Sequence, residues 1–345
     1  MQELESNHLA VFQEHRQKLF SVAYRMMGSY EDAQDLLQEA YIKFSGEDLS
    51  NIRNPAGYLV AMVTRQAIDA KRAAYEKKRV YPGPWLPEPI LDGFEESMVL
   101  SETAGAAFLF LLESLSPLER AVIVLRDVFD YEYLEIAEIV KKRSDHCRKI
   151  AERARKRIRQ ARQKDNNPAA MEPGKRYSRS GASTGEFATR SSAKVVPGAT
   201  MDEKRKRSLL ISFQKACNQG DLKSLLGLLT EDVLVHTDGG GKVSAAMRTV
   251  FGAENSSRFF AGLASKFPRS YTVPVSIGGT FSVLQFDEDD SLSSVVQFRM
   301  EDHRIAEVFA VRNPDKLRTI RRQISSSLLL RLKIRIYRRL SALLR

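Results

Sequence analysis

Residues 115–162 constrain the fold of this chain most, because they carry the pattern of a helix-turn-helix. An apolar patch over residues 134–140 is followed by the polar turn KKR and then by Ser144, a natural N-cap for the next helix. One face of that helix is small or apolar and consists of Cys147, Ile150, Ala151, Ala154 and Ile158. The opposite face is basic and consists of Arg148, Lys149, Arg153, Arg155, Lys156, Arg157 and Arg159. This division predicts a recognition helix that docks through its apolar face and presents cations to a major groove.

A basic helix face also occurs on helices that only face solvent, and the helix alone leaves that interpretation open. The paired apolar helix upstream and the density of cations favour DNA binding. The turn at residues 141–143 contains no glycine. A non-glycine residue therefore has to take any left-handed conformation that the turn needs.

The net charge of +11 over 345 residues is concentrated in two blocks, residues 141–164 and 316–345. Such blocks indicate a polyanionic partner, either nucleic acid or an anionic membrane surface. The two cysteines, Cys147 and Cys217, have no CxxC partner or histidine pair nearby, so we expect no disulfide framework and no zinc site. We also expect no cofactor and no other metal. There is no secretory signal and no apolar run of about 20 residues. We therefore expect a cytoplasmic protein without stable membrane insertion.

The chain from about Leu4 to Lys78 is predicted to be helical. Ser29 is predicted to cap a second helix, SYEDAQDLLQEAYIKF, whose exposed face carries Asp32, Asp35 and Glu39. A loop over residues 45–54 follows, and Pro55 opens a third helix that becomes basic toward its end. The next segment, VYPGPWLPEPI, holds four prolines and is extended or turned. Its Trp85 either docks onto another surface, which is not specified by the sequence, or fills a gap between neighbouring helices. Helix resumes over residues 94–113.

Residues 165–200 are rich in Ser, Ala, Gly and Pro and are predicted to be a disordered linker. From residue 201 the pattern predicts an independent α+β domain. Helices are expected over residues 206–221, 222–233 and 253–266. Antiparallel strands are expected over residues 233–238, 270–279, 280–287, 291–300 and 304–313. Beyond residue 317, a helical stripe of Leu332, Ile336, Leu340 and Leu344 competes with the period-two pattern LRLKIRI, and the sequence leaves both open.

The order of these motifs resembles the extracytoplasmic-function (ECF) group of the sigma-70 family of RNA polymerase sigma factors. The segments SYEDAQDLLQEAYIKF and residues 65–79 resemble region 2, and LSPLERAVIVLRD, EIAEIV and the basic helix resemble region 4. PGPWLPEP, DGGGK and NPDKL resemble the SigJ-type branch, which has a SnoaL-like C-terminal extension. The long linker and the basic tail depart from that pattern.

The resemblance implies a multidomain fold: all-α regions 2 and 4, then an α+β SnoaL-like cone of the ketosteroid-isomerase type. The expected segments are region 2 (1–80), a connector (81–100), region 4 (101–164), the linker (165–200), the SnoaL-like domain (201–317) and the tail (318–345). The implied function is to direct transcription initiation at specific promoters. The implied partners are core RNA polymerase, through its β′ clamp helices, promoter DNA and the chain's own C-terminal domain.

Site residues follow from the same resemblance. Polymerase binding is assigned to Asp32, Asp35 and Glu39, although an ordinary solvated face is the alternative. The −10 element and its phosphates are assigned to Asp48, Ser50, Asn51, Arg65, Lys71 and Arg72. The −35 element is assigned to Ser144, Asp145, His146, Arg148, Lys149 and Arg153. His146 without any role is an equal alternative.

Regulation in cis is assigned to loops of the C-terminal domain that meet the connector. The residues concerned are Trp85, Pro87, Asp238, Lys242, Asn313 and Asp315. On this hypothesis, removing the chain after Leu317 leaves regulation largely intact, whereas cutting it before Asn313 alters transcription.

Three alternatives stay open. In the first, the C-terminal domain is a small-molecule sensor. In the second, it is an enzyme that uses His236, Asp238 or Tyr271, although our own expectation is that the chain has no catalytic residues. In the third, the whole chain is a helix-turn-helix repressor. The tail either touches lipid, DNA or RNA, or is a frayed extension, which is the favoured interpretation.

Overall fold

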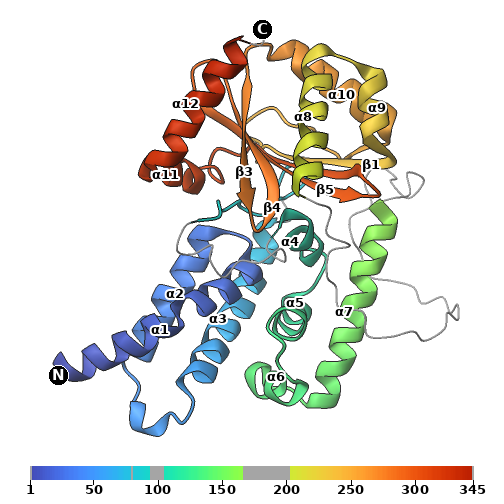
Figure 1. Ribbon diagram of the computed structural model, residues 1–345. Helices are drawn as coiled ribbons and strands as arrows, with labels where there is room; N and C mark the ends of the chain where they lie inside the picture. The colour runs from blue at the N-terminus through green and yellow to red at the C-terminus, as the bar shows by residue number, and fades with distance from the viewer. Residues whose placement is uncertain (1, 79–80, 94–104, 166–202, 344–345) are drawn as a thin grey trace, which may run out of the picture.

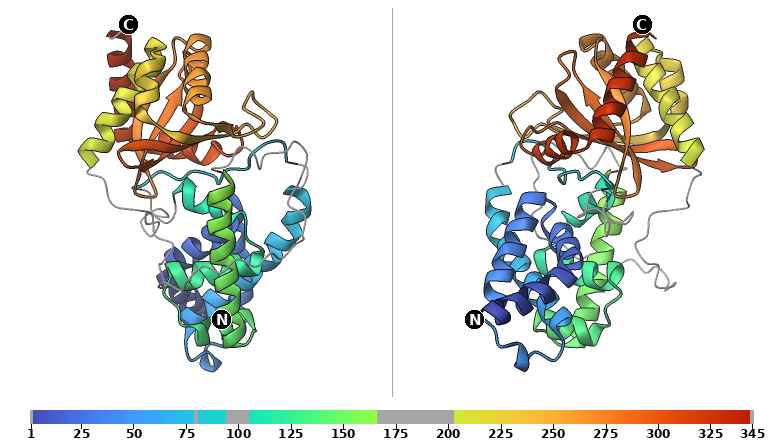
Figure 2. Two further views of the ribbon diagram at one scale, coloured as in Figure 1. Left: turned by 90° about the vertical axis from the view of Figure 1, so that its right-hand side faces the viewer. Right: turned by 60° about the vertical axis from the view of Figure 1, so that its left-hand side comes forward.

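The computed structural model describes residues 2–78, 81–93, 105–165 and 203–343. These residues form a helical lobe and an α+β lobe, and residues 81–93 run between the two (Figures 1 and 2). The arrangement agrees with the predicted order of helical domains followed by an α+β domain. Apart from Asp165, the predicted linker over residues 165–200 lies outside the described residues.

The first three helices are α1 (Gln2–Met27), α2 (Tyr30–Phe44) and α3 (Pro55–Lys78), with a 3₁₀ turn, η1 (Leu49–Asn51), between the last two. Ser29 caps α2 as predicted, since its side chain accepts a hydrogen bond from the Asp32 backbone N–H at 3.3 Å. Gly28 separates α1 from α2 with φ +74°, and a Cβ there would lie 2.7 Å from the Trp85 ring. Glycine thus permits both the turn and the close approach of Trp85.

The second group of helices forms the predicted helix-turn-helix. It comprises α4 (Ala106–Leu112), α5 (Pro117–Ile123), a π-helical turn η4 (Val124–Val128), α6 (Tyr133–Val140) and α7 (Ser144–Asp165). Ser116 and Glu119 form a reciprocal capping box at the start of α5. Lys141 adopts φ 52° and ψ 53°, so a non-glycine residue does take the left-handed position in the turn. Of the helix predicted over residues 94–113, residues 94–104 lie outside the described part.

The C-terminal lobe contains α8 (Glu203–Gln219), α9 (Leu222–Leu228) and α10 (Ala253–Lys266). Its strands are β1 (Leu229–Asp238), β2 (Val250–Phe251), β3 (Tyr271–Ile277), β4 (Thr280–Phe286), β5 (Leu292–Glu301) and β6 (Arg304–Val311). They form one sheet in the order β2-β1-β6-β5-β4-β3.

Two predictions for this lobe were wrong. The helix expected to reach Val233 ends at Leu228, because Leu229 and Val233 are buried along strand β1. The strands are not all antiparallel, because β1 pairs with β6 in parallel while the other pairs are antiparallel. The chain between β1 and β6 includes α10 and four strands, which gives it the length that a parallel crossover needs. Strand β2, with two residues, was not predicted.

The basic tail is helical and consists of α11 (Arg318–Ser326) and α12 (Leu328–Leu343). Ile320 is fully buried, and the partly buried Leu330, Ile334 and Tyr337 pack on the core of the α+β lobe. Helix α12 contacts strand β3, beside which it lies in Figure 1. The frayed-extension interpretation is therefore wrong. The predicted stripe is also wrong in phase, because Leu332 and Ile336 are about half exposed, at 51% and 49%.

Helix α4 joins the two lobes. Its Leu109 and Leu112 belong to the core of the helical lobe, whereas Ala106 and Phe110 pack into the core of the α+β lobe. The sequence AAFLFLL is apolar on all sides, as expected of a helix that is buried on both faces.

Candidate nucleic-acid interface and interdomain junction

The predicted base-reading face of α7 is accessible. Asp145, His146, Arg148, Lys149 and Arg153 are exposed and Ser144 is half-buried. Later in the helix, Arg155 forms an ion pair with Asp127, and Arg157 pairs with Glu119 at 2.6 Å. These two cations brace α7 against the preceding helices. In the described conformation, Arg155 and Arg157 are therefore engaged by carboxylates of the same domain.

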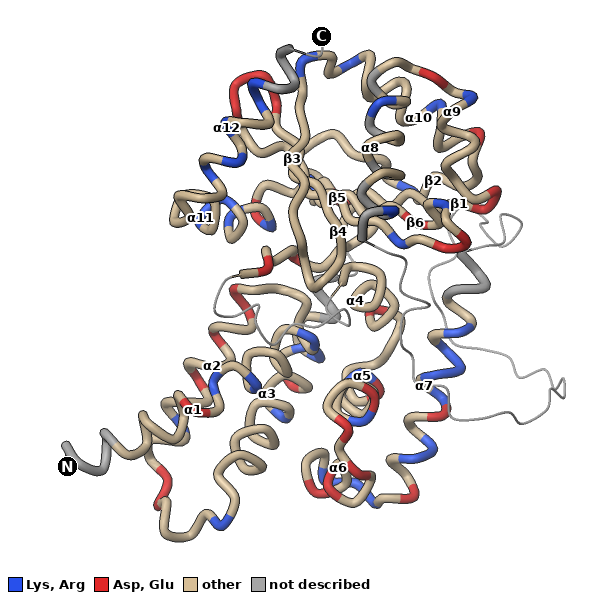
Figure 3. Tube along the Cα trace, viewed as in Figure 1, with Lys and Arg blue, Asp and Glu red and all other residues tan. Residues whose placement is uncertain are grey.

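The predicted polymerase-binding residues share one surface of α2. Asp32, Asp35 and Glu39 are all exposed, while Ala33, Leu36, Leu37 and Ala40 are buried on the other side. Figure 3 shows acidic positions along α2 and basic positions along α7. The acidic and the basic surfaces thus belong to different helical domains.

The loop assigned to the −10 element is organised by one carboxylate. Asp48 accepts hydrogen bonds from the Ser50 backbone N–H at 3.0 Å, the Ser50 hydroxyl at 2.8 Å and the Asn51 amide at 2.9 Å. Hydrogen bonds from Ser50 lower the pKa of the Asp48 carboxyl. The three predicted residues therefore lie together and are exposed, with Asp48 holding the loop conformation.

Of the three basic residues predicted to track phosphates, only Arg72 is exposed. It forms an exposed ion pair with Asp69 at 3.0 Å. Arg65 instead donates hydrogen bonds from Nε to the Ile139 carbonyl at 2.7 Å and from its guanidinium to the Glu138 carbonyl at 3.0 Å. Its guanidinium therefore ties α3 to the C-terminal end of α6.

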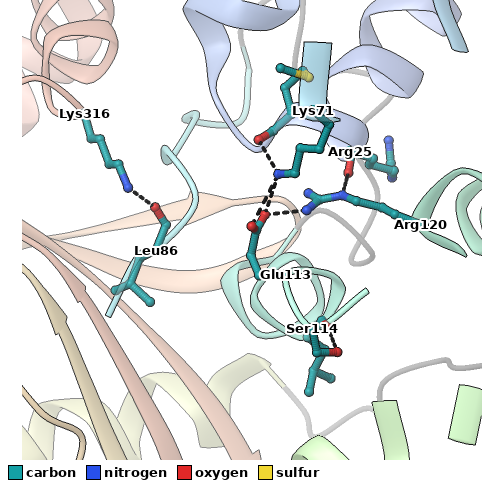
Figure 4. Close-up of polar contacts among 9 residues, drawn as sticks. Arg25, Lys71, Leu86, Glu113, Ser114, Arg120 and Lys316 are labelled. Atoms are coloured by element: carbon teal, nitrogen blue, oxygen red, sulfur yellow. Dashed lines mark hydrogen bonds and ion pairs between the residues drawn. The ribbon is translucent and has the colours of Figure 1, made fainter. Parts of the chain in front are cut away.

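Lys71 departs most from its predicted role, because only 9% of its side chain is exposed. Its ammonium donates hydrogen bonds to the Met27 carbonyl at 3.2 Å and to the Glu113 carboxylate at 3.0 Å (Figure 4). The same carboxylate pairs with Arg120, whose Nε donates to the Arg25 carbonyl at 2.7 Å. We call Lys71, Glu113 and Arg120 the Glu113 junction. It joins the first helical domain to the helix-turn-helix in a buried setting.

A second junction joins the α+β lobe to the connector. The buried Asp238 carboxylate accepts hydrogen bonds from the Tyr81 hydroxyl at 2.6 Å and from the Leu86 backbone N–H at 2.9 Å. Lys316 forms an ion pair with Asp238 at 2.7 Å. Its ammonium also donates a hydrogen bond to the Leu86 carbonyl (Figure 4). Asn313 donates to the Tyr81 hydroxyl at 2.9 Å. We call Asp238, Asn313 and Lys316 the connector clasp.

The predicted regulatory residues thus divide into two groups. Asp238 and Asn313 contact the connector, as expected of them. Lys242 and Asp315 form an ion pair with each other, with side chains 56% and 38% exposed. Lys316, which belongs to the same NPDKL segment, was not predicted.

Trp85 lies between Gly28 of the α1–α2 turn and Lys316 of the C-terminal lobe, a position that fits both docking and the filling of a gap between helices. The Lys316 ammonium lies 3.9 Å from its ring centroid and the Lys71 ammonium 5.4 Å from it. Both cations face the electron-rich ring, which attracts them. Pro87 is buried.

Glu88 is a connector residue that sequence reasoning missed. Its carboxylate accepts hydrogen bonds from the Tyr30 backbone N–H at 2.8 Å and from the Thr319 hydroxyl at 2.6 Å. Burial raises the pKa of the Glu88 carboxyl. Glu88 therefore joins the N-terminus of α2 to the tail helix α11. The sequence feature that could have identified Glu88 is its position as an acidic residue between two prolines of the connector.

The tail takes a direct part in holding the connector, since Gln323 also accepts a hydrogen bond from the Leu91 backbone N–H at 3.1 Å. Removing the chain after Leu317 would delete the contacts of Thr319 and Gln323. The tail therefore contributes contacts to the connector that the truncation hypothesis did not take into account.

The three residues considered for catalysis do not share a site. His236 is packed against Phe110 and Phe309, and burial lowers its pKa to about 3. Asp238 belongs to the connector clasp, and the Tyr271 hydroxyl donates to Asp290 at 2.9 Å. None of the three lines the cavity of the α+β lobe. Within the described ranges, no group of three or more His, Cys, Asp or Glu residues is arranged to hold a metal ion.

No helix in the described part of the chain is both long and apolar enough to cross a membrane.

Comparison with known families places two domains. Residues 11–76 match sigma-70 region 2, and residues 106–158 match sigma-70 region 4. These ranges contain α2, most of α3 and most of the helix-turn-helix described above. A repressor interpretation leaves the first match without a role.

Relatives cover most of the chain. The ECF RNA polymerase sigma factor SigJ of Mycobacterium tuberculosis is 30% identical over 261 residues, which are 74% of this chain and 73% of the relative. The probable ECF RNA polymerase sigma factor SigI of the same species is 25% identical over 327 residues, 91% of this chain and 96% of the relative. The crystal structure of M. tuberculosis SigJ matches with a TM-score of 0.64 at 25% identity, covering 90% of this chain and 98% of that one.

Proposed function

Since this chain belongs to the ECF RNA polymerase sigma factors, we propose that its C-terminal domain and tail control, in cis, how its two promoter-reading domains are held. The observation that carries the proposal is the connector clasp, because Asp238 and Lys316 both bind the backbone of Leu86. The connector follows region 2 and precedes region 4 in the chain. A domain that binds the connector therefore acts on the spacing between region 2 and region 4.

The acidic surface of α2 is the proposed contact for core polymerase. Its Asp32, Asp35 and Glu39 lie on the side of α2 away from the domain core. An exposed acidic face suits a basic helical partner, and charge complementarity of this kind mainly speeds association. The proposed partner surface is the pair of β′ clamp helices.

Core binding is tested with Asp32→Lys and Asp35→Lys in one full-length chain. The matched control is Glu231→Lys with Asp232→Lys, which makes the same charge change at exposed residues where strand β1 begins. We expect the first variant to lose binding to purified core polymerase in a pull-down titration while the control binds like the parent. Equal loss in both variants would assign the effect to net charge and contradict the proposed surface.

Promoter recognition is proposed to use the exposed face of α7 and the loop that Asp48 organises. Arg148, Lys149 and Arg153 are accessible for the −35 element in the described conformation. Arg65 and Lys71 are engaged with α6 and with Glu113. Contact of either residue with promoter phosphates therefore requires the two helical domains to separate.

We infer that the free chain is a closed form in which two junctions hold the DNA-reading domains together. The Glu113 junction binds α3 to α5, and the connector clasp binds residues 81–86 to the α+β lobe. Binding of polymerase shifts the population toward an open form only if polymerase has higher affinity for that form.

A matched pair of lysine variants tests the clasp. Lys316→Met removes the cation from Asp238 and Trp85, whereas Lys242→Met removes an exposed cation from the same lobe without a described contact to the connector. We expect Lys316→Met to speed hydrogen exchange in residues 81–91 and to change promoter-dependent transcript yield with core polymerase. Lys242→Met should change neither. If the two variants behave alike in both assays, control through the clasp is refuted.

A further inference from the structure

The α+β lobe encloses a cavity that promoter recognition does not require. Its volume is about 340 Å³, at the lower end of the range of about 300–1,000 Å³ typical of small-molecule sites. Much of the lining is apolar and comes from α8, α10 and the sheet, including Phe213, Phe259, Phe260, Leu263, Val296 and Phe298. A cavity of this composition fits a compact, largely apolar molecule.

Arg312 supplies a cation to the cavity wall. Its guanidinium donates one hydrogen bond to the Ser244 carbonyl and lies 5.8 Å from the Phe267 ring centroid. Burial lowers the pKa of Arg312. Within the described part of the chain no carboxylate lies within 4.0 Å of this guanidinium, including Asp287, which also lines the cavity. A guanidinium has five N–H donors, so Arg312 retains donors for an anionic group.

The other polar groups of the cavity bond largely to one another. The Ser294 hydroxyl donates to the Gln285 side-chain oxygen at 2.9 Å, and the Gln285 amide donates to the Ser270 hydroxyl at 3.5 Å. Thr237 donates to the Ala246 carbonyl at 3.1 Å. Arg312 is therefore the strongest recognition element for charge in the cavity, and Asp287 opposes an anion bound beside it.

The cavity wall continues directly into the connector clasp. Thr237 and Arg312 line the cavity, and each immediately precedes a clasp residue, Asp238 or Asn313. The backbone N–H groups of Arg312 and Asn313 both donate to the Asp238 carbonyl at 2.8 Å. A ligand against Arg312 therefore acts on the same backbone that holds Tyr81.

The loop between β1 and β2 provides a second connection between the cavity and the connector. Arg312 and Thr237 bind the carbonyls of Ser244 and Ala246 in this loop. One residue further on, the Met247 backbone lies beside the connector, since a Cβ on Gly83 would be 3.7 Å from the Met247 Cα. Ordering of the loop around a ligand is thereby transmitted to the connector.

We propose that this cavity binds a small, mostly apolar monocarboxylate, with its carboxylate on Arg312 and its apolar body among the phenylalanines, and that occupancy tightens the connector clasp. The inference goes beyond the sigma-factor function and does not depend on polymerase binding. Its test uses the full chain without polymerase, so failure of the ligand site and failure of the polymerase surface are distinguishable.

Binding is measured by isothermal titration calorimetry with decanoate as the probe and decanol as the uncharged comparison. Arg312→Met should weaken decanoate binding by about 10- to 100-fold, the value of a charge-assisted hydrogen bond, and should leave decanol binding unchanged. Arg258→Met, which removes an exposed α10 arginine outside the cavity, is the matched control and should bind like the parent. Asp287→Asn removes the opposing charge and should tighten decanoate binding.

The outcomes are decisive in both directions. The proposal is overturned if the parent shows no saturable decanoate binding or if Arg312→Met binds decanoate as tightly as the control. Weaker binding by Asp287→Asn would equally contradict it, and this second variant keeps the test valid if Arg312→Met does not fold. Coupling to the clasp predicts slower hydrogen exchange in residues 81–86 with saturating decanoate. Unchanged or faster exchange in these residues would contradict the proposed coupling between the cavity and the connector clasp.

Discussion

The Glu113→Gln substitution tests the Glu113 junction most directly. It keeps the shape of the side chain and removes the charge that Lys71 and Arg120 share. The Arg120 side chain is 0% exposed and the Lys71 side chain 9%, so water cannot replace the lost carboxylate. Breaking a buried ion pair by removing one partner costs about 3–5 kcal/mol.

The lower end of that range applies here. Lys71 keeps its hydrogen bond to the Met27 carbonyl, and Arg120 keeps its hydrogen bond to the Arg25 carbonyl. The glutamine oxygen also accepts one hydrogen bond. We therefore expect the stability of the closed arrangement to fall by about 3 kcal/mol, which raises the equilibrium constant for opening roughly 100-fold.

Hydrogen exchange of the full chain, followed by mass spectrometry, measures this opening locally. Peptides from α3 and α5 should exchange roughly 100-fold faster in Glu113→Gln, because their protection reports the free energy of local opening. Glu152→Gln, an exposed glutamate on α7, is the matched control and should change exchange little. Adding Lys71→Met to Glu113→Gln removes the Lys71 ammonium, which has lost its carboxylate partner in the single variant. The double variant should therefore regain part of the protection against hydrogen exchange. Exchange in Glu113→Gln within threefold of the control would refute the reasoning.

Three further predictions address burial. Because burial lowers the pKa of His236 to about 3, the unfolded chain binds a proton below about pH 6.5 that the folded chain does not. The free energy of unfolding of the α+β lobe should therefore fall by about 2 kcal/mol between pH 6.5 and pH 5. His236→Phe should remove that pH dependence in thermal melts at the two pH values. Ile320→Ala should destabilise the docked tail by about 2–4 kcal/mol, seen as faster exchange of α11, while Leu329→Ala at an exposed position should not. Gly28→Ala should displace Trp85, because its Cβ would lie 2.7 Å from the ring, and Trp fluorescence should shift.

Much of the helical lobe was predictable because its signals are local. Ser29, Ser116 and Pro55 mark helix starts through their own hydrogen bonds or ring geometry, and each occupies that position. The apolar spacing of α7 likewise determines which side faces the core, since Cys147 and Ile158 are at most 1% exposed.

Sequence reasoning failed where a pattern is compatible with two environments. LRLKIRI has apolar residues at both helical and strand spacing, and only the docking of Ile334 and Tyr337 beside β3 selects the helix and its phase. Lys71 and Arg65 have the composition of a DNA-binding helix. Their partners, Glu113 and the end of α6, are 42 and 74 residues away in the chain.

The sequence by itself determined the helix-turn-helix, the acidic face of α2 and the presence of an α+β lobe, because side-chain periodicity and capping act within a few residues. Only the tertiary structure decided that Asp238 and Lys316 grip Leu86, and that Glu88 joins α2 to α11. Each of these contacts joins buried polar groups that are far apart in sequence. Removal from water makes such groups require partners, and the packing of the two lobes against the connector determines which partners they find.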